Sequence, residues 1–238
     1  MRNLLAVAKR EFRAYFDSPI AYVLLVASVA FWSFWFFRDF FLQGQATLRS
    51  FFGLLPWTFL FLGAVLTMRL WAEERRLGTE ELLFTWPVRP GEVVLGKFVA
   101  ALALLVLTLA LSLPLPITVS ALGPLDWGPV VAGYVGAVLL GAACLSVGLF
   151  LSSLTENQIV AAILTLVVLF ALLVVGLPIV VAQSPPALTP VLEYVGFKTH
   201  FDSAVRGVLD ARDVLYYVVC VAIFLRLNAV ALAWRRWR

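Results

Sequence analysis

Residues 129–152 read PVVAGYVGAVLLGAACLSVGLFLS and contain no Asp, Glu, Lys or Arg. A helix needs about 20 apolar residues to cross the core of a bilayer, and the backbone of a segment in lipid must satisfy its own hydrogen bonds. The residues do not alternate between polar and apolar, which argues against a strand of an outer-membrane barrel. We therefore expect a membrane-spanning helix here and in five similar runs, at about 20–37, 51–70, 98–120, 158–182 and 214–234.

The composition of the whole chain supports an all-α polytopic membrane protein. Hydrophobic residues make up 63% of its 238 residues and charged residues 13%, against roughly 45–50% and about 25% in soluble domains. A soluble fold could not cover that much apolar surface. This excludes an ordinary soluble enzyme, a nucleic-acid-binding protein, a disordered chain and a disulfide scaffold. The two cysteines, Cys144 and Cys220, lie in apolar runs and give no redox or metal signal.

The basic residues predict how the chain is oriented in a cell (inner) membrane. Six spans place both termini on the same side, and that side would carry twelve basic residues against five on the other. Because basic residues remain in the cytoplasm, we expect both termini and the 71–97 loop there. The run at 20–37 is too long and aromatic for a signal peptide and no small-residue cleavage site follows it, so we expect a retained first helix.

Residues 1–19 precede the first span and have the pattern of an amphipathic helix in the membrane interface. Apolar residues recur at helical spacing with basic residues between them: Leu4, Leu5, Ala8, Phe12 and Tyr15, with Lys9, Arg10 and Arg13. Two interpretations remain open. The helix is either a basic anchor that only sets the topology, or a connector that also contacts a cytoplasmic partner.

The loop at 71–97 holds most of the acidic residues expected in the cytoplasm. Glu73 and Arg76 have the spacing of a helical ion pair, and Gly78 is suited to end the helix of the second span. Thr79 would begin a short helix at about 80–86, which Pro87 ends. One side of this helix would show the apolar residues Leu82, Leu83 and Trp86. Such a face needs either a partner protein or the chain's own spans to cover it.

Three motifs resemble those of one family of membrane proteins. Residues 73–88 follow E-E-R-x-x-G-T-x-E-L-L-x-T-x-P-V, with Glu92 and Lys97 shortly afterwards, as in the coupling segment of type-2 ABC exporter permeases. Two more motifs are similar to those of one branch of this family, which contains the gliding-motility permease and the copper-maturation permease of nitrous-oxide reductase. They are SSLTENQ at 152–158, and His200-Phe201 followed by Gly207-Val208, Asp210, Arg212-Asp213 and Tyr216. Trp86 departs from the smaller residue usual before the proline.

The resemblance implies six helices and a working homo- or heterodimer. Each chain would bind a cytoplasmic ABC ATPase, whose closure moves the coupling helices and switches the permease between inward and outward states. ATP and magnesium would belong to that ATPase, with no cofactor or nucleic acid on this chain. An accessory protein on the outer side is compatible with the resemblance, and the substrate stays open. The coupling residues carried over are Glu73, Glu74, Arg75, Gly78, Thr79, Glu81, Leu82 and Leu83, with Trp86 on the same helix and 152–158 as a lesser contact.

The alternative function is a secondary transporter or channel that works without ATP. Carriers coupled to protons or sodium place Asp, Glu or His inside the membrane, and the first five runs contain none of these residues. In the last run Arg226 is either a side chain that reaches the headgroups or part of a pathway. Asn228 would bond to another helix. Pro114, Pro116 and Pro178 are expected to break or end the third and fifth spans.

Two further patterns are weak. Residues 91–97 fit the phosphate-loop pattern G-x-x-x-x-G-K, but Phe98 stands where Ser or Thr should bind magnesium, and a span follows instead of the expected context. His200 is the only histidine and has no metal-ligand spacing, so we expect a packed or hydrogen-bonded residue. It lies in the long loop at 183–213, whose apolar pieces suit short helices in the interface.

Overall fold

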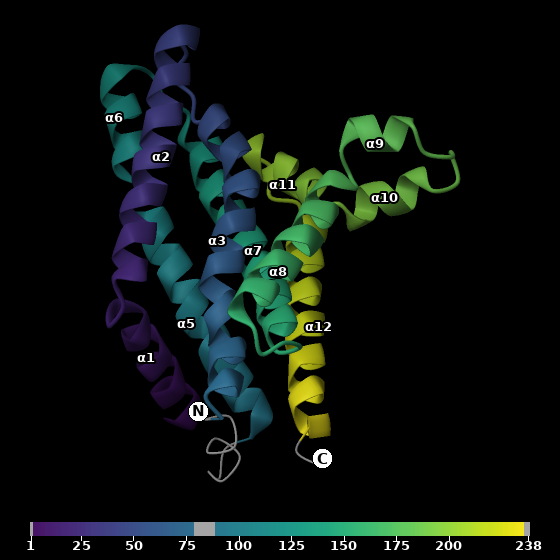
Figure 1. Cartoon of the computed structure of the whole chain (residues 1–238). Coiled ribbons are helices and arrows are strands. Elements are labelled where there is room, and N and C mark those ends of the chain that lie inside the picture. The colour runs from purple at the N-terminus through teal and green to yellow at the C-terminus, as the bar shows by residue number, and fades with distance from the viewer. Residues whose placement is uncertain (1, 79–88, 236–238) are drawn as a thin grey trace.

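The computed structural model describes residues 2–78 and 89–235, and in this part of the chain it contains helices and no strand. Figure 1 shows a bundle of long helices with shorter helices at both ends. The helices are α1 (Arg2–Phe16), α2 (Pro19–Gln43), α3 (Arg49–Arg76), α5 (Pro90–Ala110), α6 (Pro114–Leu122), α7 (Trp127–Ser152), α8 (Gln158–Val174), α9 (Pro178–Ala182), α10 (Thr189–Val195), α11 (Phe197–Val205) and α12 (Ala211–Arg235).

Five stretches of the described chain are long and apolar enough to cross a membrane: α2, α3, α5 with α6, α7 and α12. The third is interrupted by a turn at Leu111–Leu113 before Pro114, because proline cannot donate the next helical hydrogen bond. The run expected as one span at 158–182 is divided. Helix α8 ends at Val174, and the five-residue α9 starts at Pro178, so this crossing consists of a 17-residue helix and a turn.

Helices α3 and α7 form the core of the bundle. Half of the residues of α3 and most of those of α7 are buried, including Phe59, Leu66 and Leu140. Glycines on α7 allow this close packing. A Cβ built at Gly141 would lie 2.8 Å from a methyl carbon of Leu105, and one at Gly148 would meet the side chains of α3 and α8. In lipid there is no hydrophobic force between helices, and their association relies on van der Waals packing. Small residues favour this packing because they let the backbones approach closely.

Helix α2 packs far less tightly than α3. Only Ala21, Leu25, Trp32 and Phe36 of its residues are buried. Between it and α3 lies an apolar groove of about 730 Å³, whose polar edge is the hydrogen bond from Trp32 Nε1 to Thr58 Oγ1 at 3.1 Å. The first span is thus attached mainly along one narrow face.

Both termini lie at the same end of the bundle, together with the last turn of α3 and the first turn of α5 (Figure 1). Helices α9, α10 and α11 lie toward the other end. Of these, α11 is packed into the bundle through Phe197 and Phe201, whereas α9 and α10 have no buried residue. The loop expected at 183–213 therefore contains short helices, as its apolar pieces indicated.

Candidate functional site

Helix α1 packs along the first turns of α5, where a glycine removes the barrier to close contact. A Cβ built at Gly96 would lie 2.7 Å from Val7 Cγ1 and 3.2 Å from the carbonyl oxygen of Leu4. Val7 and Ala8 are buried in this contact, while Leu5, expected on the apolar face, is exposed. The buried face of α1 continues through Glu11 to Tyr15, whose hydroxyl donates to the carbonyl of Leu66 at 2.6 Å. Burial raises the pKa of Tyr15 and keeps this donor protonated.

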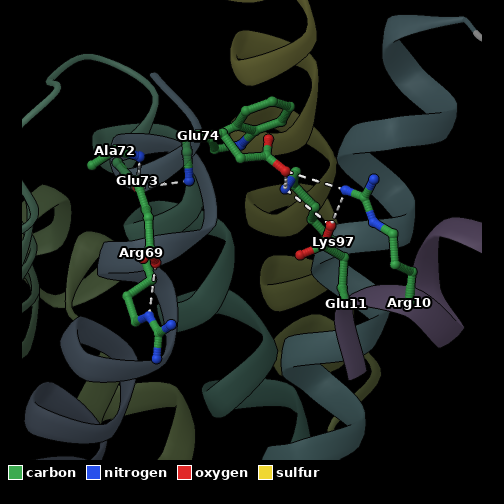
Figure 2. Close-up of polar contacts among 9 residues, drawn as sticks. Arg10, Glu11, Arg69, Ala72, Glu73, Glu74 and Lys97 are labelled. Atoms are coloured by element: carbon green, nitrogen blue, oxygen red, sulfur yellow. Dashed lines mark hydrogen bonds and ion pairs between the residues drawn. The ribbon is translucent and has the colours of Figure 1, made fainter. Parts of the chain in front are cut away.

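Lys97, the next residue of α5, is completely buried and is the centre of a cluster of ion pairs. Its Nζ lies 2.8 Å from Glu74 Oε1 on α3 and 3.3 Å from Glu11 Oε1 on α1. The ammonium also sits 4.8 Å from the centre of the Trp71 ring, within the range of a cation–π contact. Figure 2 shows Glu74, Glu11 and Lys97 converging from three helices. We call Arg10, Glu11, Glu74 and Lys97 the Lys97 cluster.

Arg10 completes the Lys97 cluster at its solvent edge. One guanidinium nitrogen lies 2.6 Å from Glu11 Oε1 and 3.2 Å from Glu74 Oε1. Two cations therefore face two carboxylates, so the formal charges of the cluster sum to zero. A buried ion pair is tolerated only when each charge has its partners, because desolvation otherwise costs several kcal/mol per ion. The arrangement therefore fixes α1, the end of α3 and the start of α5 relative to one another.

A second junction ties the end of α3 to the turn between α7 and α8. Ser152 Oγ accepts hydrogen bonds from the backbone N–H groups of Trp71 and Ala72, both at 3.3 Å, and donates to the carbonyl of Met68 at 3.2 Å. Arg75 donates to the carbonyl of Ser153 at 3.2 Å and pairs with Glu156 at 3.0 Å. The 152–158 turn is thus anchored beside the Lys97 cluster by α3.

Four of the coupling residues carried over from the resemblance lie in the described part of the chain, and the other five lie outside it. Glu74 belongs to the Lys97 cluster and Arg75 to the α7–α8 junction, while Glu73 pairs with Arg69 at 2.9 Å on another side of α3 (Figure 2). Gly78 has φ +68°, a left-handed conformation that glycine adopts without strain just after the end of a helix. The other predicted residues lie outside the described part of the chain: Thr79, Glu81, Leu82, Leu83 and Trp86.

Sequence reasoning did not assign a role to Glu11, Arg10 or Lys97 in this site. Lys97 had drawn notice through the coupling-segment motif and through the phosphate-loop pattern, and neither gave it a partner on α1 or α3. Residues 91–97 form the first turns of α5, and the Lys97 ammonium pairs with Glu11 and Glu74. One signal was available. Glu11 is an acid on the buried face of an amphipathic helix, so its carboxylate needs a cation as a partner. Lys97 stands at the start of an apolar run, where its ammonium has no solvent and needs an anion.

The two polar residues of the last span lie on different faces of α12. Arg226 is exposed, whereas Asn228 is completely buried. Within the described residues neither the amide nitrogen nor the amide oxygen of Asn228 has a hydrogen-bond partner, so the expected bond to another helix is not formed there. No group of three or more His, Cys, Asp or Glu side chains suited to a metal ion occurs in residues 2–78 and 89–235.

Comparison with known proteins identifies the family of this chain. No curated protein matches the chain. A family model described as ABC-2 family transporter protein matches residues 5–234, a range that begins within α1 and ends within α12. A match over nearly the whole chain identifies the family, and the chain therefore belongs to the ABC-2 family of transporter proteins.

Proposed function

We propose that this chain, a multi-pass membrane permease of an ABC transporter, couples ATP hydrolysis by separate cytoplasmic ATPase subunits to export of a substrate. The Lys97 cluster is the observation that carries the proposal. It closes the base of the segment between α3 and α5 with a buried ion pair from Glu74 to Lys97. A force applied to that segment would act on the ends of two membrane helices held together, and not on a flexible loop.

The coupling residues proposed are Glu73, Glu74, Arg75, Gly78, Thr79, Glu81, Leu82, Leu83 and Trp86. The α7–α8 junction supports a lesser role for the 152–158 turn. Arg75 of α3 contacts this turn, and the preceding residue, Glu74, belongs to the Lys97 cluster. In the first span the narrow attachment of α2 would let it move when α1 is displaced, since only Asp17 and Ser18 separate the two helices.

The orientation proposed is that both termini and the Lys97 cluster face the cytoplasm from the inner membrane. The excess of basic residues in the segments expected at that end supports it. We further propose that two permease chains act together and that the chain belongs to the gliding-motility and copper-maturation branch, which the motifs at 152–158 and 200–216 support. An accessory protein on the outer side is compatible with both proposals.

Co-purification tests the coupling to an ATPase. The chain is expressed with its cognate ABC ATPase, and the pair is extracted in mild detergent. Burying one leucine contributes roughly 1.5–3 kcal/mol, so Leu82→Asp and Leu83→Asp should abolish recruitment while membrane insertion is unchanged. Arg226→Ala, on the exposed side of α12, is the control and should recruit fully. Full recruitment and ATP-driven transport by both aspartate variants would show that residues 80–86 are not the coupling element. Transport by the wild type that needs neither the ATPase nor ATP would favour a carrier or channel independent of ATP, and refute the proposal.

A further inference from the structure

His200 joins three helices, α10, α11 and α12, through its ring. The residue lies on α11, a helix that Figure 1 shows toward the end of the bundle opposite both termini. Its Nδ1 is 2.7 Å from Asp213 Oδ1 on α12, and its Nε2 is 2.9 Å from the carbonyl oxygen of Tyr194 on α10. Both facing atoms are acceptors. A neutral imidazole carries one N–H and can donate to only one of them, whereas the imidazolium donates to both.

The surroundings make a missing donor costly. The side chain of His200 is 11% exposed, and its ring stacks on Tyr216 with centroids 3.9 Å apart and planes at 20°. Tyr194 packs edge-on against the same ring. The Asp213 side chain is 20% exposed, so loss of the imidazolium would cost this half-buried carboxylate a charge-assisted hydrogen bond, while a cation against an aromatic face is favoured.

Most of the charged side chains near the His200 ring are acidic. Helix α12 contributes Asp213, and Asp210 lines the same small cavity just before that helix begins. On α11 itself Lys198 and Asp202 pair with each other at 2.7 Å. From the described part of α7 only uncharged residues, Gly136 and Leu139, reach this cavity.

The phenols near His200 are already engaged. Tyr216 and Tyr217 of α12 donate to the carbonyls of Val195 and Phe197, each at 2.7 Å. They are therefore not available to supply the hydrogen that a neutral imidazole would lack.

We propose that His200 is a proton-binding site that fastens α10 to α11 and α12 when its ring carries both protons. Helix α10 has no buried residue, so its attachment relies on ring contacts and on a few hydrogen bonds. One is that of His200, and the others are donated by Tyr216 to the carbonyl of Val195 and by Thr199 to the carbonyl of Glu193, each at 2.7 Å. Loss of the second proton leaves either Asp213 or Tyr194 without its donor, and α10 is loosened. In the proposed orientation this site senses the pH outside the cytoplasm; that placement rests on the proposed function, while the proton site does not.

The first test reads the ring directly. Because the chain contains one histidine, nitrogen-15-labelled histidine in untagged protein gives the signals of His200 alone in a magnetic-resonance titration. Over the range of about pH 5 to 8 in which unperturbed histidines change charge, the wild type should keep both nitrogens protonated to higher pH than Asp213→Asn. A ring that is neutral in the wild type throughout, or that titrates identically in the variant, overturns the proposal.

The second test follows α10. Hydrogen exchange of residues 189–195 is measured across the same range in the wild type and in His200→Gln, and their ratio removes the intrinsic pH dependence of exchange. At low pH, α10 should be better protected from exchange in the wild type than in His200→Gln. The difference in protection should disappear as the pH rises. Lys198→Gln, which breaks the neighbouring ion pair of α11, should retain the wild-type dependence. A ratio that does not vary with pH refutes the link between proton and helix.

Discussion

Replacing Gly96 with alanine tests whether α1 rests on α5 as closely as the structure shows. The new Cβ would lie 2.7 Å from Val7 Cγ1 and 2.9 Å from Val7 Cβ. Carbon atoms in contact are about 3.5–4.0 Å apart, so α1 has to move outward by about 1 Å. Neither Val7 Cβ nor the backbone carbonyl of Leu4 can rotate out of the way, and the strain therefore falls on the position of the whole helix.

The overpacking determines the change in the free energy of α1 docking, and overpacking of this kind costs about 1–3 kcal/mol. Alanine gains about 1 kcal/mol over glycine inside a helix, but this gain stabilises α5 whether or not α1 is docked. The weakening of α1 docking is therefore about 1–3 kcal/mol. A 1 Å displacement would also lengthen the contact from Lys97 Nζ to Glu11 Oε1, now 3.3 Å, to about 4 Å, the limit of an ion pair. The pair between Lys97 and Glu74 does not involve α1 and should persist.

Trypsin cleavage within α1 measures this docking, because Lys9, Arg10 and Arg13 are cleavage sites on its exposed side. Loss of an N-terminal epitope tag reports the cut. Where opening is fast, cleavage follows the population of the open state, and 1.4 kcal/mol corresponds to about a tenfold change in that population. Gly96→Ala should be cut roughly five- to a hundredfold faster than the wild type.

Gly91→Ala is the matched control, since a Cβ at Gly91 meets nothing within 4 Å. It should be cut no faster than the wild type. Adding Val7→Ala to Gly96→Ala removes the closest atom and should recover part of the protection. Equal cleavage of Gly96→Ala, Gly91→Ala and the wild type would show that α1 does not pack against α5 in this way.

Three further predictions concern the ion pairs and the topology. Lys97→Met removes the buried cation that pairs with Glu11 and Glu74, so it should destabilise the protein by about 3–5 kcal/mol in chemical denaturation, whereas Asp202→Asn should have little effect. Ser152→Ala removes the acceptor shared by two backbone N–H groups, and the same denaturation should show a loss of about 1 kcal/mol. Cysteines introduced at Glu80 and at Lys198 should react with impermeant reagents from opposite sides of the membrane, and labelling of both from one side would contradict six crossings.

The sequence predicts the helical bundle well because each apolar run carries its own evidence. A charge-free segment such as 129–152 has no stable place except a membrane helix. The breaks were also visible, since Pro114 and Pro178 cannot continue a helix. The end of α8 at Val174, inside the run expected at 158–182, could not be predicted, because hydropathy does not distinguish a helix that ends there from one that continues.

The Lys97 cluster was beyond sequence reasoning for a different reason. Glu11, Glu74 and Lys97 are separated by more than sixty and by more than twenty residues along the chain, and each alone resembles an ordinary interfacial charge. Only the docking of α1 on α5 brings them together, and that docking depends on the missing side chain at Gly96. A charge pattern indicates which residues need partners, but the packing of helices decides which partners they find.

The two junctions at the end of α3 differ in how they respond to dissolved salt. In the α7–α8 junction the Glu156 side chain is 68% exposed, so counterions reach it and screen its attraction to Arg75 at a Debye length of about 8 Å in physiological buffer. Lys97 is completely enclosed by its partners and the Trp71 ring, and mobile ions cannot enter between them. Rising ionic strength therefore loosens the hold of α3 on the 152–158 turn while its hold on α1 stays firm, which makes the two attachments separable in one protein without any substitution.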